Sequence, residues 1–370
     1  MALTIVRNDI TKMHVDAIVN TTNAFFEVGG LGVDAGIHYA AGPQLKKALE
    51  QIGHCDPGSA VITDAFDIPC CKYIIHTVGP VYVDGRHGER EQLESCYRSI
   101  LALAKDRRCQ SIAIPSISTG AYGYPKAEAY SIATACIREF LLSLPDDEDM
   151  MVYIVLYDRE SVAVSEKIDA GVEQFISEAY QERQKEKLHA FYEGNRPPVQ
   201  YGTLHPTLNS VLWDRESGNE EDAAAEAEDA VKPYAEPDYS ASDSAAPHQP
   251  GDGYEKEDRS FADMCEWWCK EKGFTKKEFY NRANINKSMF WGMKHHPEQI
   301  PRKTNALACV IGLKLDYDQA IDLLQRAGLT LSKYYETDLI VEYFIREKNY
   351  DIDEINALLY QKDLSLLGTY

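Results

Sequence analysis

The sequence predicts two folded regions, a three-layer α/β/α region with a mixed sheet and a separate all-α region. In residues 1–190, apolar runs rich in β-branched residues alternate with stretches of helical period, as in a largely parallel sheet covered by helices on both faces. In residues 259–370 the period is helical throughout. Between them, residues 191–258 lack apolar periodicity and are acidic, which is typical of a disordered linker.

Composition narrows the functional class. A chain of 370 residues with 44% hydrophobic content is long enough for two domains. It contains no apolar run of about 18 residues and no signal-peptide pattern, so we expect a cytoplasmic protein without a membrane partner. The nine cysteines include no CxxC pair, which predicts reduced thiols and no metal site.

The net charge of −21 is unevenly spread along the chain. Fifteen acidic and three basic residues lie between 214 and 258. Because much of the acidity belongs to the predicted linker, it does not exclude a nucleic-acid partner for the last region.

The elements follow from periodicity and turn residues. Strands are expected over residues 2–10, 16–20, 59–65, 73–78, 111–115 and 151–157. Helices of the first region are expected over residues 33–52, 89–106, 126–144 and 161–187. Those of the last region are expected over residues 261–273, 276–284, 287–294, 302–312, 316–327, 335–348 and 351–361, with Thr275 and Asn286 as N-caps.

Two polar, glycine-rich loops each follow a strand and lead into a helix, at residues 20–32 and 116–125. Free backbone N–H groups in such a loop and the positive end of the helix dipole favour an anion. Ligands of mixed α/β folds bind at the carboxyl ends of the strands, so both loops can open onto one crevice. The pair therefore predicts a ligand whose diphosphate is held from both sides.

Three ordered motifs carry a family resemblance: DAIVNTTN followed by GVDAGIHYAAGP, then YIIHTVGPVY, then IPSISTGAYGYP. Together they resemble macrodomains of the MacroD type over about residues 1–180. The resemblance implies a domain that binds ADP-ribose and either hydrolyses ADP-ribosyl esters on proteins or deacetylates O-acetyl-ADP-ribose. It implies no cofactor and no metal.

The resemblance gives catalytic roles to three residues of the first motif. Asp34 positions the attacking water, Asn23 holds the distal ribose, and His38, one helical turn after Asp34, orients the ribose. From the residues alone, Asp34 also fits a first-turn helix aspartate and His38 a core residue. Asn20 is assigned to the ligand site, with bracing of the loop backbone as its alternative role, and His76 is expected to be structural.

The remaining ligand-binding positions also come from the resemblance. Asp9 accepts from the adenine amino group beside Ile10, and Tyr157 stacks on adenine. The two loops supply the positions around the diphosphate and distal ribose, which are Gly30, Gly32, Val33, Ser118, Thr119, Gly120, Ala121, Tyr122, Gly123 and Tyr124.

The first loop departs from the family pattern. Asn23 and Asp34 are eleven residues apart, one more than usual, Leu31 interrupts the glycines, and Phe25 and Phe26 add bulk. This departure leaves open which acceptor carries the ADP-ribose that is removed. It also supports the alternative of an ADP-ribose reader without turnover.

The last region resembles a Cro/repressor-type helix-turn-helix over about residues 261–328. Seven basic and two acidic residues lie between Lys276 and Lys303, which suits phosphate contacts. Phe290, Trp291 and Met293 crowd the would-be recognition helix and suit a protein-docking or core role at least as well. The partner is therefore either DNA or a protein, and an ADP-ribose-responsive DNA-binding regulator is a further alternative.

Overall fold

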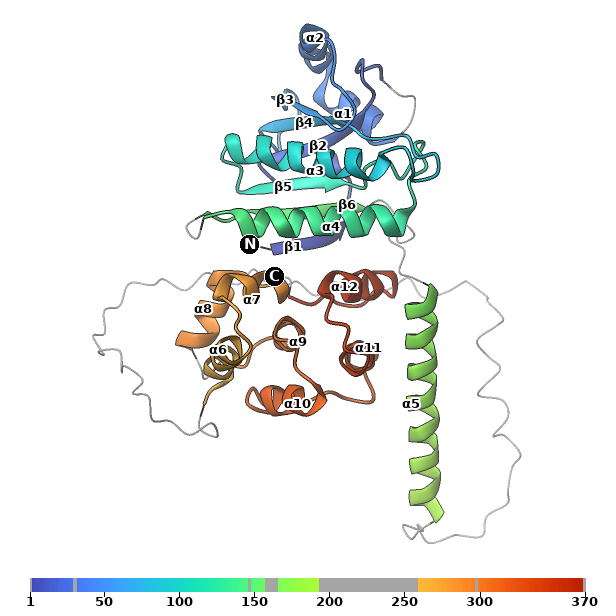
Figure 1. The fold of residues 1–370 in the computed structure, drawn as a ribbon, viewed down its shortest axis with the longest axis vertical. Helices are drawn as coiled ribbons and strands as arrows, with labels where there is room; N and C mark the ends of the chain where they lie inside the picture. Colours follow the sequence, from blue (N-terminus) through green and yellow to red (C-terminus); the bar gives the residue numbers. More distant parts are fainter. Residues whose placement is uncertain are drawn as a thin grey trace, which may run out of the picture. The chain divides into compact units, whose positions relative to one another are not determined.

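The computed structural model describes residues 2–28, 32–145, 148–156, 166–192, 259–296 and 299–368 (Figure 1). The chain divides into two compact units, one of Met1–Gln181 with Glu255–Tyr370 and one of Glu182–Tyr254. All the described strands belong to the first unit. None of the described helices has the length and apolarity needed to cross a membrane.

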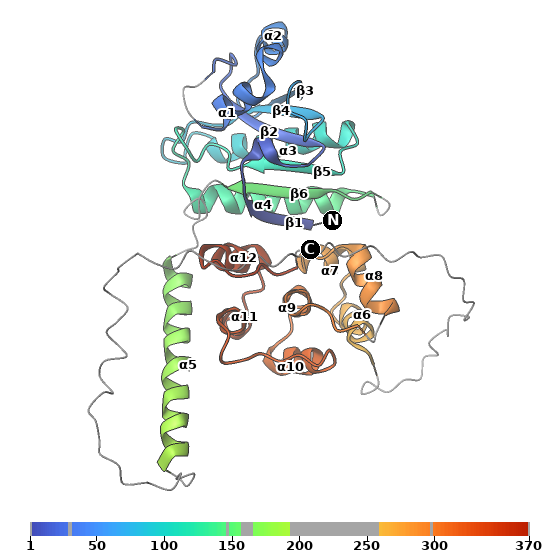
Figure 2. The same ribbon diagram turned by 180° about the vertical axis from the view of Figure 1, so that it is seen from behind.

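Six strands form one mixed sheet, as predicted. They are β1 (Ala2–Arg7), β2 (Ala17–Thr22), β3 (Ala60–Asp64), β4 (Tyr73–Val78), β5 (Ser111–Pro115) and β6 (Met151–Leu156). Their order is β1-β6-β5-β2-β4-β3, which can be followed from bottom to top in Figures 1 and 2. All neighbours are parallel except β3, which runs antiparallel to β4.

Helices cover both faces of the sheet and give the predicted three layers. They are α1 (Val33–Ala41), α2 (Pro43–Ile52), α3 (Glu89–Asp106) and α4 (Lys126–Ser143). Helix α5 (Glu166–Tyr192) is not one of these covering helices, because its buried Val172 belongs to the core of the C-terminal helical region. Successive residues of β2 point to opposite faces, so Ile18 joins the core under α1 and α2 while Val19 joins the core under α3 and α4. Helices α3 and α4 lie on one face, in front of the sheet in Figure 1.

The single helix expected over residues 33–52 is wrong, because the chain breaks it into α1 and α2. Gly42 ends α1 at a φ of 74°, and Pro43 begins α2 at the position where a missing N–H costs nothing. A side chain at residue 42 would also collide with Asp67, whose Oδ2 lies 2.2 Å from the position of a Cβ. Because of this break, α1 and α2 run in different directions, and α1 extends to the functional site described below.

The helical region contains α6 (Phe261–Glu271), α7 (Lys276–Arg282), α8 (Lys287–His295), α9 (Lys303–Gly312), α10 (Tyr317–Gln325), α11 (Glu336–Arg346) and α12 (Ile352–Gln361). Both predicted N-caps are confirmed: Thr275 forms a capping box with Glu278, and Asn286 accepts from the N–H of Met289 at 2.6 Å. All residues from Asn305 to Gly312 of α9 are buried. All nine cysteines are free thiols. The DNA-binding role of α7 and α8 stays a prediction.

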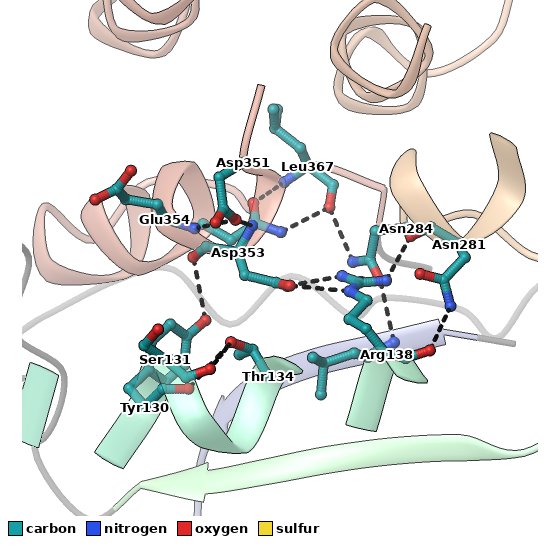
Figure 3. Close-up of polar contacts among 12 residues, drawn as sticks. Tyr130, Ser131, Thr134, Arg138, Asn281, Asn284, Asp351, Asp353, Glu354 and Leu367 are labelled. Carbon is teal, nitrogen blue, oxygen red and sulfur yellow. Dashed lines mark hydrogen bonds and ion pairs between the residues drawn. The ribbon is translucent and has the colours of Figure 1, made fainter. Parts of the chain in front are cut away.

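The helical region packs on the α/β region through α4 and the edge strand β1 (Figure 3). Arg138 of α4 is the centre of this contact. Its Nε and Nη2 donate to the Asp353 carboxylate at 2.9 and 2.7 Å, and its Nη1 donates to the carbonyl of Asn281 at 2.6 Å. Burial alone would lower the pKa of Arg138, but the Asp353 carboxylate, with smaller effects of Tyr130 and Asp351, raises it.

Asn284 links the same contact to the sheet. Its Oδ1 accepts from Nη2 of Arg138 at 3.1 Å and from the backbone N–H of Leu3 at 3.0 Å. An edge strand exposes unpaired N–H groups, and here one of them is satisfied by the helical region. The predicted domain boundaries stay a prediction, and the predicted linker over 191–258 lies almost entirely outside the described residues.

Candidate functional site

A cavity of about 380 Å³ lies at the carboxyl ends of β2, β5 and β6, where α1 begins. This volume is within the range of small-molecule sites. Predicted site residues supply much of its lining: Asn23, Gly32, Val33, Asp34, Ser118, Thr119, Gly120, Ala121 and Tyr122. The two glycine loops therefore open onto one crevice, as the alternation of strands and helices indicates.

Some positions are not part of that lining. Among the described residues, the predicted positions that do not line the cavity are Asp9, Ile10, Asn20, His38, Gly123 and Tyr124. Gly30 and Tyr157 lie outside the described residues. The cavity is also lined by seven residues that were not predicted as site residues: Thr21, Thr22, Gly79, Pro115, Ser116, Val155 and Leu156. Their positions at strand ends were the available signal.

The loop after β5 turns its backbone toward the cavity. Ser118 has a φ of 63°, and its carbonyl accepts from the N–H of Tyr124 at 2.9 Å. Gly123, at a φ of 68°, donates its N–H to the carbonyl of Gly120 at 3.0 Å. Among the described residues, the N–H groups of residues 119–121 meet no acceptor. Such a run of open N–H groups is suited to bind an anion.

Gly79 lets this loop approach the end of β4. A Cβ at residue 79 would lie 2.2 Å from Oγ of Ser118 and 2.8 Å from Cγ2 of Ile117. Neither distance leaves room for a side chain, so the loop position depends on a glycine here.

Asp34 lies in the first turn of α1, lines the cavity and is 8% exposed. Its Oδ1 accepts from Nδ2 of Asn20 at 2.7 Å. Nε2 of His38 lies 3.6 Å from the same oxygen. The helix N-terminus favours an anionic ligand next to this side chain.

The two asparagines of the first loop differ from expectation. Asn20 does not brace the loop backbone; it is fully buried and contacts Asp34 and, at 3.2 Å, Nδ1 of His76. The loop is braced instead by Asn23, whose Oδ1 accepts from the N–H groups of Phe25 and Glu27, both at 3.1 Å. Its Nδ2 donates to the carbonyl of Glu27 at 2.5 Å.

The bulky residues of the lengthened loop explain why Asn23 is used in this way. Phe26 has a φ of 57° and is buried in the core under α1 and α2, so the chain turns sharply after Asn23. Phe25 is 68% exposed and packs edge-on against His54 at 5.2 Å. Neither phenylalanine lines the cavity, so the extra bulk does not narrow it directly.

Asp9 follows β1 and caps a short 3-10 helix, η1 (Ile10–Lys12). Its Oδ1 accepts from the N–H and the hydroxyl of Thr11 at 3.0 and 2.7 Å. The Thr11 hydroxyl is the main reason that the pKa of Asp9 is lowered. Ile10 is buried in the same core cluster as Ile18. The adenine contact of Asp9 stays a prediction.

The two tyrosines of the second loop separate in role. Tyr122 lines the cavity, and its carbonyl accepts from the N–H of Tyr82 at 2.9 Å. Tyr124 is 2% exposed, its ring lies 4.8 Å from that of Tyr82, and burial raises its pKa to about 12. Tyr124 therefore packs in the core beneath the loop.

Comparison with known proteins agrees with this geometry. The family model described as Macro domain matches residues 19–133. A Macro domain-containing protein of Chlorobaculum tepidum is 45% identical over 166 residues, which cover 45% of this chain and 95% of the relative. An O-acetyl-ADP-ribose deacetylase of Salmonella gallinarum is 47% identical over 165 residues, 43% of this chain and 89% of the relative.

A solved Trypanosoma brucei macrodomain in complex with ADP-ribose is 35% identical, covers 43% of this chain and 66% of that chain, and has a TM-score of 0.39. The relative from Chlorobaculum tepidum is matched over nearly its whole length at 45% identity. On that match, and with the family model over residues 19–133, the chain belongs to the macrodomain family.

Proposed function

We propose that the α/β region is a cytoplasmic ADP-ribosyl hydrolase that removes ADP-ribose from mono-ADP-ribosylated proteins, deacetylates O-acetyl-ADP-ribose, or does both. One observation carries the proposal: the buried carboxylate of Asp34 and the open N–H groups of residues 119–121 border the same cavity. Relatives named O-acetyl-ADP-ribose deacetylase, 47% identical, support the same chemistry.

In the proposed complex the diphosphate binds residues 119–121 and the N-terminus of α1, which leaves the distal ribose next to Asp34. A water held between the Asp34 carboxylate and a diphosphate oxygen attacks the ester carbonyl carbon. The bond between that carbon and the ribose oxygen then breaks, and the ribose oxygen takes a proton from the water. The products are ADP-ribose and a free carboxylic acid. Positioning and electrostatics supply the rate, so the step requires no metal.

The substrate is tested by incubating the full chain with O-acetyl-ADP-ribose and with proteins mono-ADP-ribosylated on acidic side chains. We expect release of ADP-ribose from at least one of them, measured by chromatography. Binding of ADP-ribose by calorimetry without release from either substrate would contradict the hydrolase proposal.

A second candidate is an ADP-ribose reader without turnover. It is favoured by Asn23, because the side chain that the resemblance assigns to the distal ribose is hydrogen-bonded to the backbone of its own loop. In that case, ADP-ribose binds but Asp34 has no correctly placed substrate carbon. The combination of calorimetry with the release assay distinguishes the two candidates.

A third candidate is a DNA-binding regulator that responds to ADP-ribose through the helix-turn-helix. Trp291 is 56% exposed on α8, but two nearby cations, Lys276 and Lys294, both bind Glu266 at 2.8 Å. That pairing lowers the charge available for phosphates and favours a protein partner. A mobility shift on DNA that weakens with salt and changes with ADP-ribose would support this candidate, and no shift at low salt would remove it.

A further inference from the structure

We propose that Thr63 and His76 are positioning residues for the reaction, because they fix the orientation of the Asn20 amide that holds Asp34. The inference rests on the proposed function for the catalytic role of Asp34. The contacts cross three neighbouring strands, from the edge strand β3 through β4 to β2, and end at the first turn of α1.

The hydrogen bonds form an unbroken series. Oγ1 of Thr63 donates to the carbonyl of Asp64 at 3.0 Å and lies 3.0 Å from Nε2 of His76. Nδ1 of His76 lies 3.2 Å from Nδ2 of Asn20, which donates to Oδ1 of Asp34 at 2.7 Å. Asn20 and His76 are register partners in the parallel pairing of β2 with β4.

Burial leaves these groups few other partners. Asn20 and His76 are 0% exposed, and Thr63 is 9% exposed. Burial, with a smaller effect of His38, lowers the pKa of His76 to about 3, so its ring is neutral near pH 7 and carries one N–H. Where that single proton lies decides the orientation of everything between Thr63 and Asp34.

The Thr63 hydroxyl determines which ring nitrogen of His76 carries the proton. A hydroxyl has one hydrogen, and this one is given to the carbonyl of Asp64, so toward His76 it can only accept. The His76 proton is therefore on Nε2, and Nδ1 is a bare acceptor. Only the NH₂ end of the Asn20 amide can donate to that acceptor, and its second hydrogen is directed to Asp34.

The opposite orientation of Asn20 is disfavoured twice. It would place the amide oxygen against both the Asp34 carboxylate and the bare Nδ1 of His76. In the observed orientation, Oδ1 of Asn20 is buried without a partner among the described residues. The flipped amide would lose its hydrogen bond to Asp34 and place two acceptors against its oxygen, which costs more than the one unpaired oxygen of the observed orientation.

The activity test removes only the Thr63 hydroxyl. In Thr63→Val, Nε2–H of His76 loses its acceptor, the ring gains access to the Nδ1–H form, and Asn20 no longer holds Asp34. We expect kcat for O-acetyl-ADP-ribose to fall by about tenfold or more, with the affinity for ADP-ribose retained. Thr63→Ser keeps the hydroxyl and restores kcat.

Thr77→Val is the matched control. Thr77 is a buried threonine of β4 whose hydroxyl donates to the carbonyl of Ser59 at 2.9 Å, outside the series. This variant loses one buried hydrogen bond and keeps kcat. A Thr63→Val enzyme with the kcat of Thr77→Val, or a Thr63→Ser enzyme as slow as Thr63→Val, would overturn the proposal.

A second readout is independent of turnover. Nitrogen-15 NMR of the histidine ring should show His76 of the full chain as the neutral Nε2–H form down to about pH 5. An Nδ1–H form in the unmodified protein overturns the inference even if Thr63→Val does not fold. An unmodified protein without turnover but with the Nε2–H form would refute the proposed hydrolase and leave the hydrogen-bond series supported.

Discussion

Removing the Arg138 side chain should loosen the contact between the α/β and helical regions. Arg138 and Asp353 have side chains that are 13% and 14% exposed, and Arg138→Met deletes two bonds to that carboxylate and two to Asn281 and Asn284. Breaking a buried pair by removing one partner costs about 3–5 kcal/mol, because the other charge stays buried. Asp351 adds to the cost, since burial and the neighbouring Asp353 already raise its pKa.

The assay is thermal unfolding of the full chain beside a matched arginine variant. Arg98 of α3 is 59% exposed and binds Glu94 at 3.1 Å, so Arg98→Met should cost less than about 1 kcal/mol. We expect Arg138→Met to lower Tm by roughly 10 °C and Arg98→Met by little.

A second substitution identifies the cause. In Arg138→Met with Asp353→Leu, the unpaired Asp353 carboxylate is gone, and so is the like charge beside Asp351, so most of the lost stability should return. Equal Tm values for Arg138→Met and Arg98→Met would refute the assignment of Arg138 as the centre of the contact. A double variant no more stable than Arg138→Met would refute the electrostatic reason.

Three further outcomes are expected at the site. Below about pH 6.5, His76 is protonated in the unfolded chain but stays neutral in the folded one. The contribution of His76 to the free energy of unfolding is therefore complete above that pH and is lost as pH falls toward about 3. Urea unfolding should therefore show about 2 kcal/mol more loss between pH 7 and 5 for the unmodified protein than for His76→Gln. Asn23→Ala removes the bonds that brace the loop and should cost about 1–2 kcal/mol by the same assay. Gly79→Ala, which drives a Cβ against Ser118, should weaken ADP-ribose binding by about tenfold in calorimetry, whereas Gly36→Ala, where the added Cβ meets nothing, should leave it unchanged.

The crevice could be predicted because its causes are local. A strand, a glycine loop and a helix start recur at residues 20–32 and 116–125, and parallel strands bring such loops to one edge. A single helix was predicted where the chain forms α1 and α2, because the apolar spacing continues across Gly42. The proline after that glycine was the signal that decides the break.

The roles of the asparagines could not be predicted from spacing. Asn20 and Asn23 sit three residues apart in one motif, and either amide can brace a loop. The distinction comes from partners far away in sequence: His76 faces Asn20 across β2 and β4, while the turn at Phe26 closes the loop on Asn23.

The contact between the α/β region and the helical region could not be predicted from the sequence either. Arg138 and Asp353 are 215 residues apart, and in the sequence each is typical of an ordinary charged residue on a helix surface. Their pairing depends on how α12 and α7 meet α4, which is a property of the packed structure rather than of any motif.

Asp34→Asn is the decisive variant for the proposed hydrolysis, with Glu91→Gln, an exposed first-turn acid of α3, as control. Asparagine keeps the shape of the side chain and can still accept from Asn20, so ADP-ribose affinity should change by no more than a few-fold. We expect hydrolysis of O-acetyl-ADP-ribose to fall by about 100-fold or more in Asp34→Asn and to be unchanged in Glu91→Gln. Turnover by Asp34→Asn at the rate of Glu91→Gln would contradict a catalytic role for the Asp34 carboxylate.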